Sequence, residues 1–114
     1  MTNEILKEEI LKEEELEQIA GGNRDELALD TQLFNIMGGR IKPYDLDDIT
    51  NKNVNGIAAR ITSLYGKLGI QMKYNDFGAN SYFLNGKPIP RNQAVVEALN
   101  RAGYHNIDPK PFQI

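Results

Sequence analysis

The stretch IAARITSLYGKL, residues 57 to 68, decides the fold of this chain. Its apolar side chains recur at steps of four, three, one and three residues, which is the spacing of one face of an α-helix. We therefore expect a core-facing helix that ends at about Gly66 or Gly69, where glycine favours termination. The residues of the predicted face are Ile57, Ile61, Leu64, Tyr65 and Leu68.

The residues after this helix predict an antiparallel sheet. Ile70 to Tyr74 alternates apolar and polar side chains, as a half-buried strand does. Ser81 to Leu84 leads into Asn85-Gly86, the strongest short-range signal for a hairpin, and the chain returns over Lys87 to Ile89. The returning segment contains a proline, which cannot donate a backbone hydrogen bond, so we expect it at the edge of the sheet.

Two further helices are predicted on either side of these elements. The apolar residues of Arg24 to Met37, Ile36 among them, fit a short helix that ends at the pair Gly38-Gly39. Asn92 to Ala102 has a second helical face, with Asn92 as the expected N-cap and Gly103 as the stop. The expected fold class is α+β, a small single domain of helices and a three-stranded antiparallel sheet.

The composition limits what the chain can do. Its 114 residues have room for one small domain and an extension. Cysteine is absent, which excludes disulfides, thiolate metal sites and a cysteine nucleophile. No apolar run approaches the roughly 18 residues of a membrane span. The N-terminus lacks the basic start and apolar middle of a Sec signal, so we expect a chain without one.

Charge divides the chain after Gly22. Residues 1 to 22 hold seven acidic and two basic residues, a net charge of −5, whereas residues 23 to 114 hold nine acidic and eleven basic residues, a net charge of +2. Such asymmetry indicates an acidic arm and a near-neutral body with different roles. The arm is rich in Glu, Leu and Lys from Asn3 to Ala20, which predicts a helix that the following glycine pair ends.

The end of this arm resembles the double-glycine leader of bacteriocin-type and other peptide precursors. In that family a leucine stands twelve residues before the cut, a glutamate eight before it, and apolar residues seven and four before it, ahead of two glycines. Lys12 stands where the family often has a serine, and we expect it to face solvent. The matching positions are Leu11, Glu15, Leu16, Ile19, Gly21 and Gly22.

This spacing also has a physical basis. On a helical wheel of about 100° per residue, Leu11, Ile19 and Leu16 lie at about 20°, 100° and 160°, an arc that fits an apolar groove. Glu15 lies at about 60°, inside the arc, where a helix packed only against its own domain would carry an apolar residue. We interpret Glu15 as a recognition charge. The other apolar residues leave the arc, so we expect the helix to be exposed or partly frayed until a partner captures it.

The resemblance implies a leader, residues 1 to 22, helical or partly disordered, and an exported cargo domain, residues 23 to 114. A peptidase-containing ABC transporter would bind the leader with its cysteine-protease domain, cut the Gly22-Asn23 bond and export the cargo through its transmembrane cavity. A protease pocket too narrow for any Cβ accepts only glycine at the last two leader positions. The chain is thus expected to be made in the cytoplasm of a bacterium and secreted as a bacteriocin-like polypeptide.

Two alternatives remain open. The first is that the glycine pair at the end of the arm is only a helix stop, in which case the chain is a cytoplasmic protein-interaction module. The second concerns the internal pair Gly38-Gly39, which is preceded by Leu33 and Ile36 at the spacing of a leader. That pair makes cleavage before Arg40 an alternative to cleavage before Asn23.

Residues typical of catalysis or metal binding are scarce. His105 is the single histidine, so neither a catalytic triad nor a histidine metal site is supported. Asp45, Asp47 and Asp48 lack the spacing and the closing glutamate of a calcium loop. We therefore expect no enzyme activity, no cofactor and no metal. We also expect no nucleic-acid binding and no stable membrane insertion, since a net charge of +2 is weak evidence for either surface. The basic residues considered for a patch are Arg60, Lys67, Lys73, Lys87, Arg91 and Arg101.

Overall fold

The helix predicted from residues 57 to 68 organises the structure. In the computed structural model, which describes residues 23 to 114, this helix is α3 (Val54–Lys67). Its buried side contains four of the five predicted residues, and the fifth, Leu68, is half-buried just beyond its end. The following Gly69 has a φ of +82°, a left-handed conformation that glycine adopts without a Cβ clash. The predicted helix and its face are therefore confirmed.

A three-stranded antiparallel sheet follows, in the order β1-β2-β3. Its strands are β1 (Ile70–Lys73), β2 (Ser81–Leu84) and β3 (Lys87–Ile89). Between β2 and β3, Asn85 and Gly86 have φ angles of +54° and +81°, as a type I′ turn requires at both central residues. Pro88 lies in β3, an edge strand, as predicted.

The helix α2 (Asn23–Ile36) confirms the predicted element. Ile36, one of the apolar residues behind the prediction, is 43% exposed. The buried side has the helical spacing of three and four residues but mixes polar with apolar side chains. Leu27, Leu33 and Phe34 of the apolar pattern are buried, whereas the polar members of the buried side lie outside that pattern. The buried residues with this spacing are Asn23, Glu26, Leu27, Asp30, Thr31 and Phe34.

The helix α4 (Arg91–Arg101) begins one residue before the predicted start, and its N-cap is Pro90 rather than Asn92. The Nδ2 of Asn92 donates to the carbonyl of Ile114 at 3.1 Å, and its Oδ1 accepts from the Ile114 N–H at 3.1 Å. The predicted N-cap is therefore wrong, because a long-range contact with the chain end occupies this side chain. Gly103, with a φ of +88°, follows the helix as predicted.

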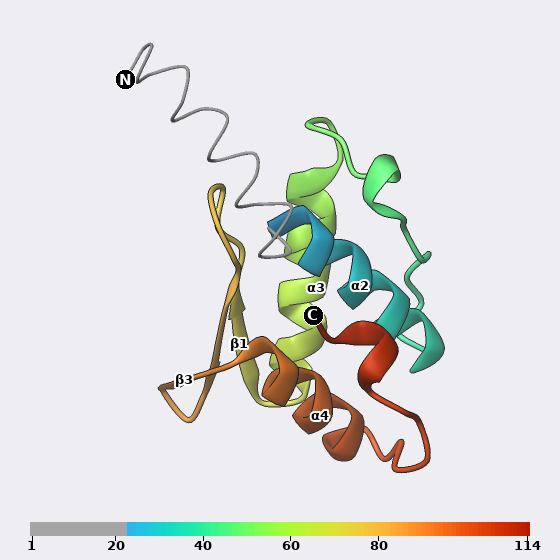
Figure 1. Ribbon diagram of the computed structural model, residues 1–114, viewed down its shortest axis with the longest axis vertical. Coiled ribbons are helices and arrows are strands. Elements are labelled where there is room, and N and C mark those ends of the chain that lie inside the picture. Colours follow the sequence, from blue (N-terminus) through green and yellow to red (C-terminus); the bar gives the residue numbers. More distant parts are fainter. Residues whose placement is uncertain (1–22) are drawn as a thin grey trace.

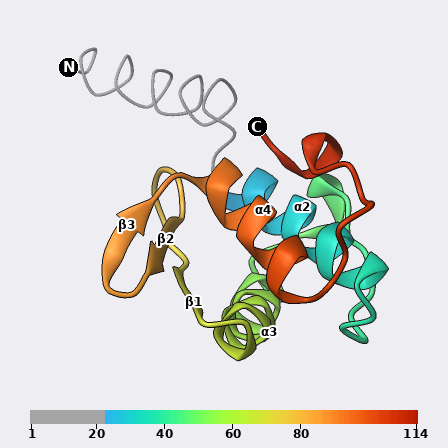
Figure 2. The same ribbon diagram turned by 90° about the horizontal axis from the view of Figure 1, so that it is seen from below.

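The sheet lies to one side of the helices (Figures 1 and 2). α3 packs against β1 and α4 against β2, while α2 lies against α3 and against the short 3-10 turn η2 (Lys110–Phe112). A second 3-10 turn, η1 (Leu46–Asp48), interrupts the loop between α2 and α3. The buried apolar side chains of these elements form one core. The expected α+β domain with a three-stranded antiparallel sheet is confirmed for the described residues.

Candidate functional site

Asn23 is the one described residue among those predicted to direct cleavage. It follows the predicted cut, begins α2 and is only 5% exposed. The structure thus describes the residue on the body side of the predicted cut. The other predicted residues lie outside the described part of the chain; they are Leu11, Glu15, Leu16, Ile19, Gly21 and Gly22.

Asn23 is held by the loop between β1 and β2. Its side-chain Nδ2 donates to the carbonyl of Asn75. Its own carbonyl accepts from the Nδ2 of Asn80 at 3.1 Å. Asn80 is itself buried, and its Oδ1 accepts from the Asn75 N–H at 3.0 Å. The first turn of α2 is therefore bound on two sides by a loop more than 50 residues away in sequence.

Glu26 completes this junction cluster, which we define as Asn23, Glu26, Asn75 and Asn80. Its Oε1 accepts from the Asn80 N–H at 2.8 Å, and the residue is 3% exposed. Burial raises the pKa of Glu26 to about 7, against the opposing effects of the Asn80 amide and the Arg91 charge. The protonation state of Glu26 therefore changes near neutral pH. The same carboxyl accepts the hydrogen bond from Asn80, which in turn holds Asn23.

One turn further along α2, the fully buried carboxylate of Asp30 binds three elements at once. Its Oδ1 accepts from the Tyr65 hydroxyl of α3 at 2.7 Å and from Nη1 of Arg91 of α4 at 2.8 Å. Its Oδ2 accepts from the Tyr82 hydroxyl of β2 at 2.9 Å. Nη2 of Arg91 donates to the carbonyl of Phe112 at 2.8 Å, which ties the C-terminal tail to the same network.

The electrostatics of this network favour a structural role. Burial and the Asp30 charge raise the pKa of both Tyr65 and Tyr82 well above the usual value, so the two hydroxyls remain donors. Burial acts against the charge of Arg91, but Asp30 outweighs it and the pKa of Arg91 is raised. The two oxygens of Asp30 are both occupied by donors, so this carboxylate is not free to act as a base. The network fixes the elements relative to one another.

The internal glycine pair has a complete structural explanation. Gly38 has a φ of +74°, and the Gly39 N–H donates to the carbonyl of Phe34 at 2.8 Å, which ends α2. A Cβ on Gly39 would lie 3.0 Å from that same carbonyl oxygen. Cleavage before Arg40 would also cut the covalent link between α2 and the rest of the core. These contacts favour Gly38-Gly39 as a helix stop rather than a cleavage signal.

The residues considered for catalysis and calcium binding lie apart. His105 is exposed in the tail, and Asp45, Asp47 and Asp48 are exposed in or beside η1. Oδ2 of Asp48 accepts from the Asp45 N–H at 3.2 Å, a local contact of the turn. Within residues 23 to 114, no group of three or more His, Cys, Asp or Glu side chains is arranged to hold a metal ion.

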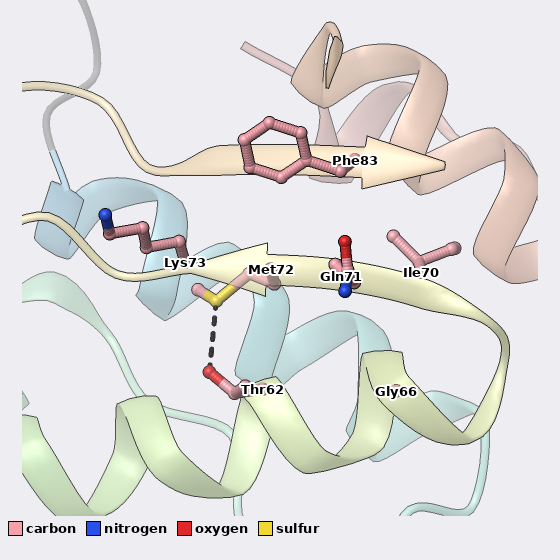
Figure 3. A pocket seen from close by; sticks show the side chains of 7 residues that line it. All are labelled: Thr62, Gly66, Ile70, Gln71, Met72, Lys73 and Phe83. Carbon is pink, nitrogen blue, oxygen red and sulfur yellow. Dashed lines mark hydrogen bonds between the residues drawn. The ribbon is translucent and has the colours of Figure 1, made fainter. Parts of the chain in front are cut away.

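A shallow hollow lies between α3 and the sheet (Figure 3). Thr62 and Gly66 of α3 form one wall, and Met72 and Lys73 of β1, with Phe83 of β2, form the other. The Thr62 hydroxyl lies 3.4 Å from the Met72 sulfur. Lys73 is the one ionisable side chain of its lining, so the hollow offers no pair of nucleophile and base.

Two of the basic residues considered for a patch are held by acidic partners. Arg91 is buried against Asp30, and Arg101 pairs with Glu97 of the same helix at 3.1 Å. Arg60 instead shares a pocket with three cations that no sequence pattern singles out, since they lie in loops of no regular period. These are Arg40, Lys42 and Lys52.

The Asp30 network predicts a large difference between the two ion pairs of residues 23 to 114. Asp30→Asn should destabilise the protein by about 3 to 5 kcal/mol, because it leaves the buried Arg91 charge without a counter-ion. Glu97→Gln removes the exposed pair with Arg101 and should cost less than about 0.5 kcal/mol. Urea denaturation of the full chain measures both values, and similar losses for the two variants would refute the role of Asp30.

Glu26 predicts a dependence of stability on pH. Its pKa of about 7 lies above the unfolded value of 4.5, so the protonated group stabilises the fold below pH 4.5 and this contribution is lost as the pH rises through 7. The change is at most about 3 kcal/mol, which is the free energy that corresponds to the difference between these two pKa values. Denaturation at a series of pH values should show a smaller decline for Glu26→Gln than for the wild type. A decline of the same size in both proteins would show that other groups cause it.

None of the helices in the described part of the chain combines the length and the apolar character that a membrane crossing needs. The chain matches no protein-family model, no curated protein and no solved structure.

Proposed function

We propose that this chain is the precursor of a secreted, bacteriocin-like polypeptide. Residues 1 to 22 act as a double-glycine leader for a peptidase-containing ABC transporter, which cuts the Gly22-Asn23 bond and exports residues 23 to 114. The leader residues Leu11, Glu15, Leu16 and Ile19 support this proposal through their spacing before the glycine pair. The catalytic groups of the reaction belong to the transporter.

The place of α2 in the fold is the observation that carries the proposal. This helix begins at Asn23, directly after the glycine pair, and supplies Asp30 to the buried network. A cut after Gly22 leaves every contact of that network in place. A cut after Gly39 would remove Asp30 and the apolar residues of α2 from the core. The first pair is therefore the one that a maturing protease can use without destroying its product.

The contacts of Asn23 add a requirement to this cleavage. A protease binds its substrate in an extended form, whereas Asn23 is helical and buried. The first turn of α2 must open before the bond reaches the active site, and local opening of a helix end costs far less than global unfolding. Opening breaks the hydrogen bonds of Asn23 to Asn75 and Asn80 but leaves Asp30, two turns further on, in place.

Substitution of the second glycine tests the proposed cut. Gly22→Val in the full chain should abolish cleavage, because a pocket that excludes Cβ atoms cannot accept valine. Mass spectrometry after incubation with the peptidase domain of such a transporter should find residues 23 to 114 from the wild type and the intact chain from the variant. Circular dichroism of both chains controls for folding.

Two other results of this experiment would overturn the proposed cut. A product that begins at Arg40 would identify the internal pair as the site. If neither chain is ever shortened, the N-terminal arm belongs instead to a cytoplasmic protein-interaction module.

Glu15 tests the recognition step separately. Glu15→Gln should slow cleavage about tenfold, the effect of losing one charge-assisted hydrogen bond. Glu17 is a matched control, since it lies at about 260° on the same wheel, away from the recognition arc. Glu17→Gln should be cut at the wild-type rate. Equal rates for the two variants in a time course would mean that Glu15 is a solvated charge.

A further inference from the structure

The body has a pocket that is lined by basic side chains. A broad, open pocket of about 400 Å³ lies between the loop that follows α2 and the N-terminal half of α3. Its lining contains four basic side chains and no acidic one. The four cations are Arg40, Lys42, Lys52 and Arg60.

The described chain provides no counter-ion for these cations. Its ion pairs join Arg91 to Asp30 and Arg101 to Glu97, so none of the four pocket cations takes part in one. The aspartates of the neighbouring η1 turn do not line the pocket. Like charges gathered at one place repel each other, and a bound anion would relieve that repulsion.

Two of the cations are held in position by the fold. Nη2 of Arg60 donates to the carbonyls of Gly39 and Arg40 at 3.1 and 3.0 Å, which fixes the guanidinium against the loop. The Lys42 ammonium lies 5.0 Å from the centroid of the Tyr44 ring, at the distance of a cation–π contact. A site whose donors are already placed loses less freedom when a ligand binds.

The backbone around the pocket shows two further signs of a binding site. Arg40 has a φ of +58°, a left-handed conformation that costs energy for a residue with a Cβ and is concentrated at functional sites. The first turn of α3 carries no acidic residue, so the positive end of the helix dipole adds to the field of the four cations.

We infer that this pocket binds a phosphate-bearing anion. Arginine and lysine together suit a phosphoryl group, because the planar guanidinium donates to two oxygens and the ammonium adds a point charge. The phosphoryl group belongs either to a soluble small molecule or to the headgroup of an anionic lipid, and the site recognises the same chemistry in both. This inference does not depend on the proposed cleavage.

Gly56 offers a way to block the pocket without disturbing the core. It lines the pocket on α3, and a Cβ added there would meet no atom within 4 Å. Gly66 is a matched control, because it lies on the same helix, is equally open to a side chain and does not line this pocket. Leucine at either position should be tolerated, since it favours a helix more than glycine does.

The experiment titrates the full chain and its variants with glycerol 3-phosphate while amide chemical shifts are followed at constant ionic strength. We expect shifts confined to residues 40 to 60, binding lost in Gly56→Leu and binding kept in Gly66→Leu. The double variant Lys42→Gln, Lys52→Gln should bind at least about tenfold more weakly. The double variant Lys67→Gln, Lys73→Gln has the same charge change outside the pocket and should bind as the wild type does.

Vesicles separate the two sources of the phosphoryl group. A lipid headgroup is identified if the protein sediments with phosphatidylglycerol vesicles but not with phosphatidylcholine vesicles. Gly56→Leu should then abolish this sedimentation. Binding of glycerol 3-phosphate without sedimentation would identify a soluble ligand. If Gly56→Leu and Gly66→Leu bind every probe equally, or if the shifts spread over all exposed lysines, the pocket is not a phosphate site.

Discussion

The buried carboxylate of Asp30 is the interaction on which the rest of the structure depends. Its partners come from α3, β2 and α4, and Arg91 extends the network to the C-terminal tail. A charge removed from water is costly unless its partners are all in place. A shift of α3, β2 or α4 away from Asp30 would leave part of this charge unpaired. The network contributes specificity of packing, while the core supplies most of the driving force.

The junction and the network lie on the same side of α2. Asn23, Glu26 and Asp30 follow one another at steps of three and four residues, so all three face the body. The first turn can open and release Asn23 while Asp30 still holds the helix in the core. Under the proposed cleavage, a protease would reach the end of a folded domain whose centre stays closed. Glu26, whose pKa is raised to about 7, lies between the first turn of α2 and Asp30.

Local signals made most of the fold predictable. The face of α3, the Asn85-Gly86 turn and the edge strand were all readable because each depends on residues adjacent in sequence. The polar part of the buried face of α2 was not, because Glu26 and Asp30 do not belong to an apolar pattern. Asn92 was misplaced for a related reason. Its side chain does not cap the helix, because it forms hydrogen bonds with Ile114 instead.

The sequence by itself determined the helices, the hairpin and the acidic arm with its leader-like spacing, since each of these depends on residues that are close in sequence. Only the tertiary structure decided which polar groups meet. Asp30 and Arg91 stand 61 residues apart, and the pocket cations Arg40 and Arg60 come from a loop and a helix. The partner of a charge depends on how separate elements pack, and no local period carries that information.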